Sequence, residues 1–131
     1  MKLFITAKFL GDENRVDIEK LCRITRDAGF DDFCFIRDVE KFQLGVFSDA
    51  HVLMSRAREE ILKCDALLID VSDNPSDGRI IEAGIAFGLN KRIIAIAKRG
   101  TEFKVPVLGI SDNIIEYDVI EDVLNPLKLI A

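Results

Sequence analysis

Four carboxylates lie within thirteen residues of one another around one apolar run of the chain. Asp70 lies near the end of the run ALLIDV (66–71), Asp73 and Asp77 lie in the loop SDNPSDG, and Glu82 lies in the apolar segment after it. Several carboxylates at one edge of a fold are costly unless they are solvated, paired or used in a reaction. A fixed, partly desolvated carboxylate can act as a nucleophile, since a nucleophile needs orientation more than basicity. Glu82 is therefore the candidate catalytic residue.

The same residues also have ordinary structural interpretations. Arg79 and Glu82 are three positions apart and could pair on a solvated helical face. Asp73, Asp77 and their neighbours are common turn formers. A Mg²⁺ site built from the aspartates is a weaker alternative, so we predict neither a metal nor a cofactor. The phosphate-binding patterns GxxxxGK[ST] and GxGxxG do not occur in the chain, which leaves the common phosphate-loop interpretations without support.

The elements that must position these residues alternate along the chain between strands and helices. Strands are predicted at 2–6, 33–36, 66–71, 92–97 and 114–117; helices at 16–28, from 48 or 49 to about 63, at 79–90 and from about 119; loops at 39–47 and 98–112. Buried parallel strands with helical crossovers explain this alternation. We predict an α/β fold, a three-layer sandwich whose five-stranded, mostly parallel sheet has the flavodoxin-like doubly wound order, as a single domain over residues 1–131.

Ligands of doubly wound sheets bind at the carboxyl ends of the strands. In this chain that edge would collect residues 6–8, 37–38, 70–78 and 98–100. The predicted binding residues at this edge, besides Glu82, are Lys8, Phe9, Asp38, Asp70, Asp73, Ser76, Asp77 and Gly78. Gly78 lets the chain turn tightly into the helix that carries Glu82. Phe9 could stack on a base and Lys8 could meet an anion, although a core aromatic and a solvated lysine are simpler interpretations.

Composition and charge restrict the class of partner. The chain has 131 residues, 18 basic and 23 acidic side chains and a net charge of −5. This balance argues against binding to a nucleic-acid polymer, which depends on neutralising phosphates. No apolar run reaches membrane-spanning length, and the first residues do not form a signal peptide, so we expect a cytoplasmic protein without a membrane partner. The three cysteines lie in apolar runs and are predicted to be core thiols.

Three segments together resemble the nucleoside 2-deoxyribosyltransferase-like family. They are FITAKF (4–9), CDALLIDVSDNPSDGRIIEAGIAFGLNKRIIAI (64–96) and PVLG (106–109), and the resemblance covers most of the chain. The specific element is the pattern D-G-x-x-x-E-x-G, formed here by Asp77, Gly78, Glu82 and Gly84.

The resemblance implies a function at the N-glycosidic bond of a (deoxy)nucleoside or nucleotide. Glu82 would attack the anomeric carbon, the base would leave, and a second base or water would resolve the glycosyl ester. One fixed carboxylate against an oxocarbenium-like centre suits retaining glycosyl transfer. The loop 72–78 would hold the sugar hydroxyls, and residues 7–9 would face the base or a phosphate.

Two positions depart from the family's pattern. Relatives often carry a second acid eight residues before the aspartate that leads the third strand, and Ala57 occupies that position here. The acidic loop residue often lies six positions before the glutamate, where this chain has Ser76, and Asp77 follows one position later. The family also completes its site from a neighbouring subunit, for which Ser111, Asp112 or Asn113 are candidates here. We accordingly expect a homodimer or larger homo-oligomer.

Two alternatives from other classes stay open. Ala57 in place of an acid motivates a nucleotide-binding or sensing module without efficient chemistry. The segment FITAKF gives slight support to a TIR-like domain that cleaves NAD.

Overall fold

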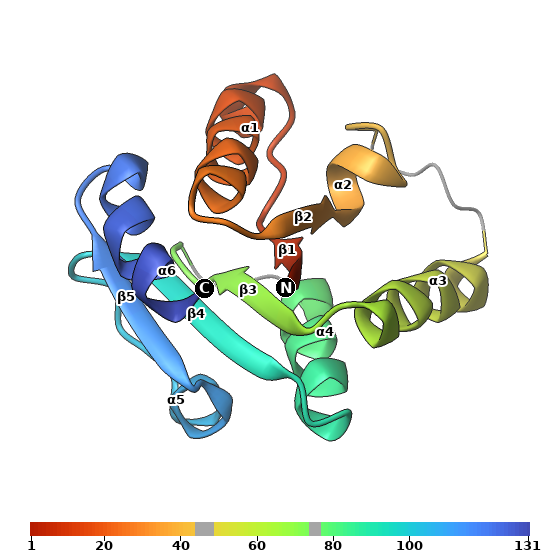
Figure 1. Cartoon of the computed structure of the whole chain (residues 1–131). Coiled ribbons are helices and arrows are strands. Elements are labelled where there is room, and N and C mark those ends of the chain that lie inside the picture. The colour runs from red at the N-terminus through yellow and green to blue at the C-terminus, as the bar shows by residue number, and fades with distance from the viewer. Residues whose placement is uncertain (44–48, 74–76) are drawn as a thin grey trace.

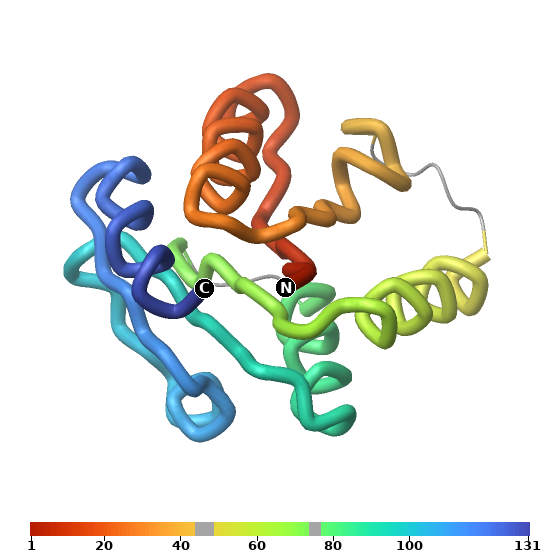
Figure 2. The backbone as a smooth tube through the Cα atoms, in the orientation of Figure 1, coloured from red at the N-terminus to blue at the C-terminus, as the bar shows by residue number. Residues whose placement is uncertain are grey.

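The computed structural model describes residues 1–43, 49–73 and 77–131, so Ser48 and Ser76 of the sequence predictions lie outside the described residues (Figures 1 and 2). The elements are β1 (Lys2–Thr6), α1 (Asp12–Asp27), β2 (Asp31–Cys34), α2 (Phe35–Asp38), α3 (Ala50–Lys63), β3 (Ala66–Asp70), α4 (Asp77–Gly88), β4 (Arg92–Lys98), α5 (Val105–Ile110), β5 (Asn113–Tyr117), a 3₁₀ turn η1 (Ile120–Val123) and α6 (Leu124–Ile130). Helices and strands thus alternate as predicted.

Across the described residues, one five-stranded sheet has the order β2-β1-β3-β4-β5. Every neighbouring pair of strands is parallel, with Leu3 opposite Ala66 and Ile94 opposite Asn113 as examples of the register. The central strands are buried on both faces, which explains their continuous apolar sequences. The predicted α/β class and flavodoxin-like order are confirmed.

The two faces of the sheet carry separate apolar cores. On β1, Leu3 and Ile5 belong to the core beneath α1 and α6, whereas Phe4 belongs to the core beneath α3, α4 and α5. The helices thus form outer layers on either side of the sheet (Figure 1). Because side chains alternate across a strand, the position of a residue at the end of a strand decides which face of the sheet its side chain reaches.

The second strand differs from its prediction. A strand was expected at 33–36, but β2 ends at Cys34 and the next residues form the short helix α2. The Asp38 carboxylate accepts the backbone N–H of Cys34 at 3.0 Å, and Arg37 holds both Asp38 and Asp32. These local polar bonds compete with the strand ladder and turn the chain into a helix despite its apolar sequence.

The predicted loop 98–112 contains the helix α5. Pro106 lies in its first turn, where proline's fixed φ suits a helix and its missing N–H costs nothing. With six residues, α5 is too short to show a helical apolar repeat in the sequence. Asp49, one of the two positions at which this helix was predicted to begin, caps α3 by accepting the N–H groups of His51 and Val52.

Cys22, Cys34 and Cys64 are buried free thiols, which confirms the prediction of core thiols. Within the ranges that the structure describes, no helix has the length and apolar character that crossing a membrane requires. The same ranges contain no group of three or more His, Cys, Asp or Glu residues able to hold a metal ion.

Candidate active site

Glu82 lies in the second turn of α4, the helix that follows β3. Ala83 and Ala86 pack α4 against the sheet, and their small side chains bring the helix close to the strands. Glu82 is half-buried, at the carboxyl edge of the sheet. The hydroxyl of Thr6, the last residue of β1, donates a hydrogen bond to Glu82 Oε1 at 3.2 Å. The carboxylate is therefore both withdrawn from solvent and fixed in direction.

The environment of Glu82 raises its pKa to about 7 from an ordinary value of 4.5. Burial is the main cause because it disfavours the charged form, and the negative charge of Glu40 acts in the same direction. The hydrogen bond from Thr6 and the positive charge of Arg79 oppose this rise because both stabilise the carboxylate. Glu82 thus changes its charge near neutral pH, which is unusual for a glutamate.

A cavity of about 320 Å³ opens beside Glu82, a volume within the range of small-molecule sites. It is lined by Ile5, Thr6, Ala7, Lys8, Phe9, Phe35, Ile36, Glu40, Leu53, Met54, Ala57, Gly78, Arg79 and Glu82. The lining combines apolar and aromatic walls with a few polar groups, the composition expected of a site for a flat, partly polar ligand.

Arg79 supplies a buried cation one helical turn before Glu82. The residue is 3% exposed, and its guanidinium donates a hydrogen bond to the backbone carbonyl of Asp70. Burial lowers the pKa of Arg79, although the nearby charges of Asp70, Asp73 and Glu82 favour the charged guanidinium. Since arginine remains charged throughout the physiological range, Arg79 gives the site a fixed positive charge.

Replacement of Thr6 by valine, Thr6→Val, should raise the pKa of Glu82 above about 7, because the hydroxyl that stabilises the charged carboxylate is lost. Titration of the Glu82 carboxyl carbon by NMR measures the change. The matched control is Thr101→Val, at a position away from this cavity. An unchanged titration midpoint in Thr6→Val would contradict the role of this hydrogen bond.

Asp70 does not share the cavity of Glu82. Its side chain accepts the backbone N–H of Ser72 at 2.9 Å and the hydroxyl of Tyr117 at 2.7 Å. The Ser72 hydroxyl in turn accepts the backbone N–H of Lys98 at 2.8 Å. These bonds tie together the carboxyl ends of β3, β4 and β5, on the face covered by α1 and α6. Asp70 thus lies in a second cavity, of about 360 Å³.

The two cavities share a wall formed by Ala7, Lys8 and Arg79. Of the residues predicted to bind ligand, Lys8, Phe9 and Gly78 line the cavity of Glu82. The ring of Phe9 packs against the ring of Phe42, with centroids 5.5 Å apart. The structure thus brings the segment after β1 and the start of α4 together, as the sequence predicted.

The other predicted residues lie elsewhere. Asp73 is exposed, has a left-handed backbone with φ 57°, and lines the second cavity. Asp77 is exposed at the first residue of α4. Asp38 forms bonds with Cys34 and Arg37 and is not part of the wall around Glu82.

Ala57 is buried and lines the cavity of Glu82, so the position at which the family resemblance predicts an acid lines the same space. Asp112 and Asn113 lie at the opposite, amino end of β4: Asp112 accepts the N–H of Ile93, and Asn113 accepts a hydrogen bond from Arg92. Within one chain they are therefore remote from Glu82, and their contribution from a second subunit stays a prediction.

The sequence analysis placed Thr6 at the binding edge but did not predict its bond to Glu82, and it missed Glu40. The bond of Thr6 could have been inferred from its place at the end of a buried strand, on the same face as Phe4. Glu40 lies in a segment without periodicity, and no local pattern of the sequence indicates that its carboxyl lines the cavity.

Solved structures with the same architecture include three that align over nearly the whole chain. The CMP N-glycosidase BcmB of Clostridium botulinum has a TM-score of 0.75 at 19% identity, covering 100% of both chains. A 2-deoxyribosyltransferase of Bacillus psychrosaccharolyticus has a TM-score of 0.74 at 20% identity, covering 95% of this chain and 91% of its own. This chain has the nucleoside 2-deoxyribosyltransferase-like fold.

A conserved protein of Enterococcus faecalis has a TM-score of 0.78 at 14% identity, covering 100% of this chain and 99% of its own. A scan against models of protein families and a search of curated proteins found no match. The similarity is therefore one of backbone architecture.

Proposed function

We propose that the protein cleaves or transfers across the N-glycosidic bond of a nucleoside or nucleotide, with Glu82 as the nucleophile. One observation carries this proposal: a half-buried carboxylate, held by the Thr6 hydroxyl, faces a cavity of about 320 Å³ at the carboxyl edge of the sheet. The edge is the place where doubly wound sheets bind their ligands.

The properties of Glu82 suit attack on an anomeric carbon. Its partial desolvation raises the free energy of the charged form, which increases the reactivity of the carboxylate toward a carbon that develops positive charge. A pKa of about 7 leaves a substantial ionised fraction at neutral pH. The hydrogen bond from Thr6 engages Oε1 and leaves Oε2 as the atom that attacks.

The walls of the cavity suit the rest of the substrate. Phe9 and Phe35 provide aromatic surface for a base, and Lys8 and Arg79 provide positive charge for a phosphate or for polarised sugar oxygens. Two proteins with the same fold are described as a CMP N-glycosidase and a 2-deoxyribosyltransferase, and both of these activities break an N-glycosidic bond.

The test incubates the purified protein with a panel of ribonucleosides, deoxynucleosides and their 5′-monophosphates. Chromatography measures the release of free base. Water alone as acceptor identifies hydrolysis, and addition of a second base identifies transfer. Rapid quenching and peptide mass spectrometry should detect a glycosyl ester on the peptide that contains Glu82. Absence of base release from every member of the panel would overturn the proposal.

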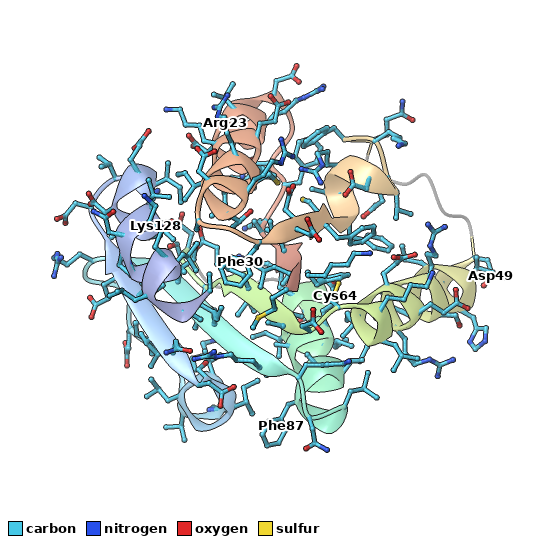
Figure 3. The ribbon with its side chains drawn as sticks, in the orientation of Figure 1. Arg23, Phe30, Asp49, Cys64, Phe87 and Lys128 are labelled. Carbon is cyan, nitrogen blue, oxygen red and sulfur yellow. The ribbon has the colours of Figure 1, made fainter. Side chains whose placement is uncertain are left out.

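A homo-oligomer stays a prediction. Figure 3 shows Phe87 near the end of α4, and within this helix Phe87 is 54% exposed and Ile81 is 50% exposed. These apolar side chains could pack against a second copy of the chain. A site completed by a neighbouring subunit needs such an interface. Light scattering in solution determines the state.

A further inference from the structure

A second carboxyl group lines the cavity of Glu82. Glu40 follows α2 and belongs to the wall of the same 320 Å³ space. Its negative charge is among the causes that raise the pKa of Glu82, which places the two carboxyls within electrostatic reach of each other. Retaining glycoside cleavage commonly uses two carboxyl groups in one cavity. One attacks the anomeric carbon, and the other donates a proton to the leaving group.

The two groups differ in the partners that surround them. Glu82 accepts a hydrogen bond from Thr6 and lies near the positive charge of Arg79. The Glu40 carboxyl has no hydrogen bond or salt bridge with any residue in the described ranges, and burial raises its pKa. The Glu82 carboxylate is thus held in one direction by Thr6, whereas the Glu40 carboxyl lines the same cavity without a fixed polar partner among the described residues.

No other acid of the described wall can take this role. The charged residues that line the cavity are Lys8, Glu40, Arg79 and Glu82. Helix α3 contributes Leu53, Met54 and Ala57, which are all apolar. Ala57, where the family resemblance predicts an acid, lines this cavity. Helix α3 therefore contributes no proton donor to the cavity.

The backbone holds Glu40 in a defined place. Its N–H bonds to the carbonyl of Phe35 at 3.1 Å, and the N–H of Phe42 bonds to the carbonyl of Ile36 at 2.8 Å. Lys41 and Phe42 both adopt left-handed backbone angles, with φ 54° and 56°. Non-glycine residues in this region are held there by their surroundings at a cost in free energy.

We propose that Glu40 is the general acid that protonates the departing base, in place of the acid that Ala57 does not provide. This inference rests on the proposed function. The bond between the anomeric carbon and the base nitrogen breaks, its electron pair leaves with the base, and the proton of Glu40 moves to the base. A Glu82 oxygen forms the ester bond to the anomeric carbon.

The second half of the reaction returns both carboxyls to their starting states. A water oxygen attacks the anomeric carbon, the ester bond breaks, and Glu82 leaves as a carboxylate. The Glu40 carboxylate accepts the proton that the water loses. An incoming base with an N–H group replaces water in the same step when the outcome is transfer.

The experiment compares wild type with Glu40→Gln on two substrates of the same sugar. One is the nucleoside or nucleotide cleaved fastest by wild type, and the other is the 4-nitrophenyl glycoside, whose leaving group departs without a proton. We expect kcat on the first substrate to fall by about 10²-fold or more in Glu40→Gln. On the 4-nitrophenyl glycoside kcat should stay within about threefold of wild type. The loss of rate at high pH, caused by deprotonation of the acid, should disappear in the variant.

Glu59→Gln, at an exposed glutamate of α3, is the matched control and should leave both rates unchanged. A fall of the same size on both substrates would show a structural role for Glu40, and an unchanged rate on the natural substrate would exclude it as the acid. Either result overturns this inference while the proposed function stands. An inactive wild type overturns both.

A titration independent of catalysis also tests the pair. The carboxyl carbon of Glu82 is followed by NMR in wild type and in Glu40→Gln, which removes the neighbouring negative charge. The titration midpoint of Glu82 should fall below about 7 in Glu40→Gln, since that charge helps to raise the pKa of Glu82. An unchanged midpoint would overturn the placement of the two carboxyls within electrostatic reach of each other.

Discussion

Glu82→Gln should lower the rate of base release by at least about 10³-fold, since the amide cannot form the glycosyl ester. Glutamine has nearly the same shape as glutamate and still accepts the hydrogen bond from Thr6 through its carbonyl oxygen. The cavity and its other walls should therefore keep their geometry. The measurement is kcat and KM for the best substrate of wild type, with the mass of the Glu82 peptide recorded after rapid quenching.

Two controls separate loss of the nucleophile from loss of folding or of substrate binding. Glu59→Gln carries the same substitution at an exposed position of α3 and should keep wild-type rates. Binding of substrate to Glu82→Gln, measured by calorimetry, should persist, because the aromatic and cationic walls are unchanged. A variant that cleaves at the wild-type rate would show that Glu82 is not the nucleophile.

The same substitution should stabilise the protein at alkaline pH. The folded state holds the Glu82 proton with a pKa of about 7, against 4.5 for an ordinary glutamate. The folded protein thus binds this proton more tightly than the unfolded chain does. The free energy of unfolding therefore falls as pH rises from about 4.5 through about 7, and the loss is complete above that range. Between about pH 5 and 8.5 the loss amounts to about 2–3 kcal/mol.

Glutamine has no proton to lose, so Glu82→Gln avoids this loss. Its stability relative to wild type should rise by about 2–3 kcal/mol between about pH 5 and 8.5, as measured by urea unfolding at the two pH values. Glu59→Gln should show no such pH-dependent difference. Equal effects of Glu82→Gln at both pH values would contradict the raised pKa. A gain in stability with a loss of activity is the trade-off expected of a functional group held in an unfavourable environment.

The architecture could be predicted because each central strand is a continuous apolar run between turn residues. ALLID becomes β3 and RIIAIAK becomes β4, and both are buried on both faces. The prediction was wrong after β2, where the apolar residues Phe35 and Ile36 belong to a short helix. The bonds that end the strand come from Asp38 and Arg37, and such local polar competition is invisible to apolar periodicity.

The candidate site was predicted in part. The motif pointed to Glu82 and the strand-edge rule to the segment of Lys8 and Phe9, and all three residues line one cavity. The grouping of Asp70 with Glu82 missed the alternation of side chains along the strand. Leu67 and Ile69 of β3 face α4, so Asp70 faces the opposite core and bonds with Tyr117. Thr6, by the same alternation, faces α4 and meets Glu82.

The turn at Lys41 and Phe42 couples the position of the Glu40 carboxyl to the aromatic wall of the cavity. No described polar contact anchors the Glu40 carboxyl, and the ring of Phe42 lies between Phe9, 5.5 Å away, and the guanidinium of Arg15, 4.3 Å away. The orientation of the Glu40 carboxyl accordingly depends on the packing of the neighbouring Phe42 and Phe9 rings rather than on a polar contact. A substitution at Phe9 would alter the surface offered to the base and loosen the proton donor together, so selectivity and acid catalysis would vary as one trait.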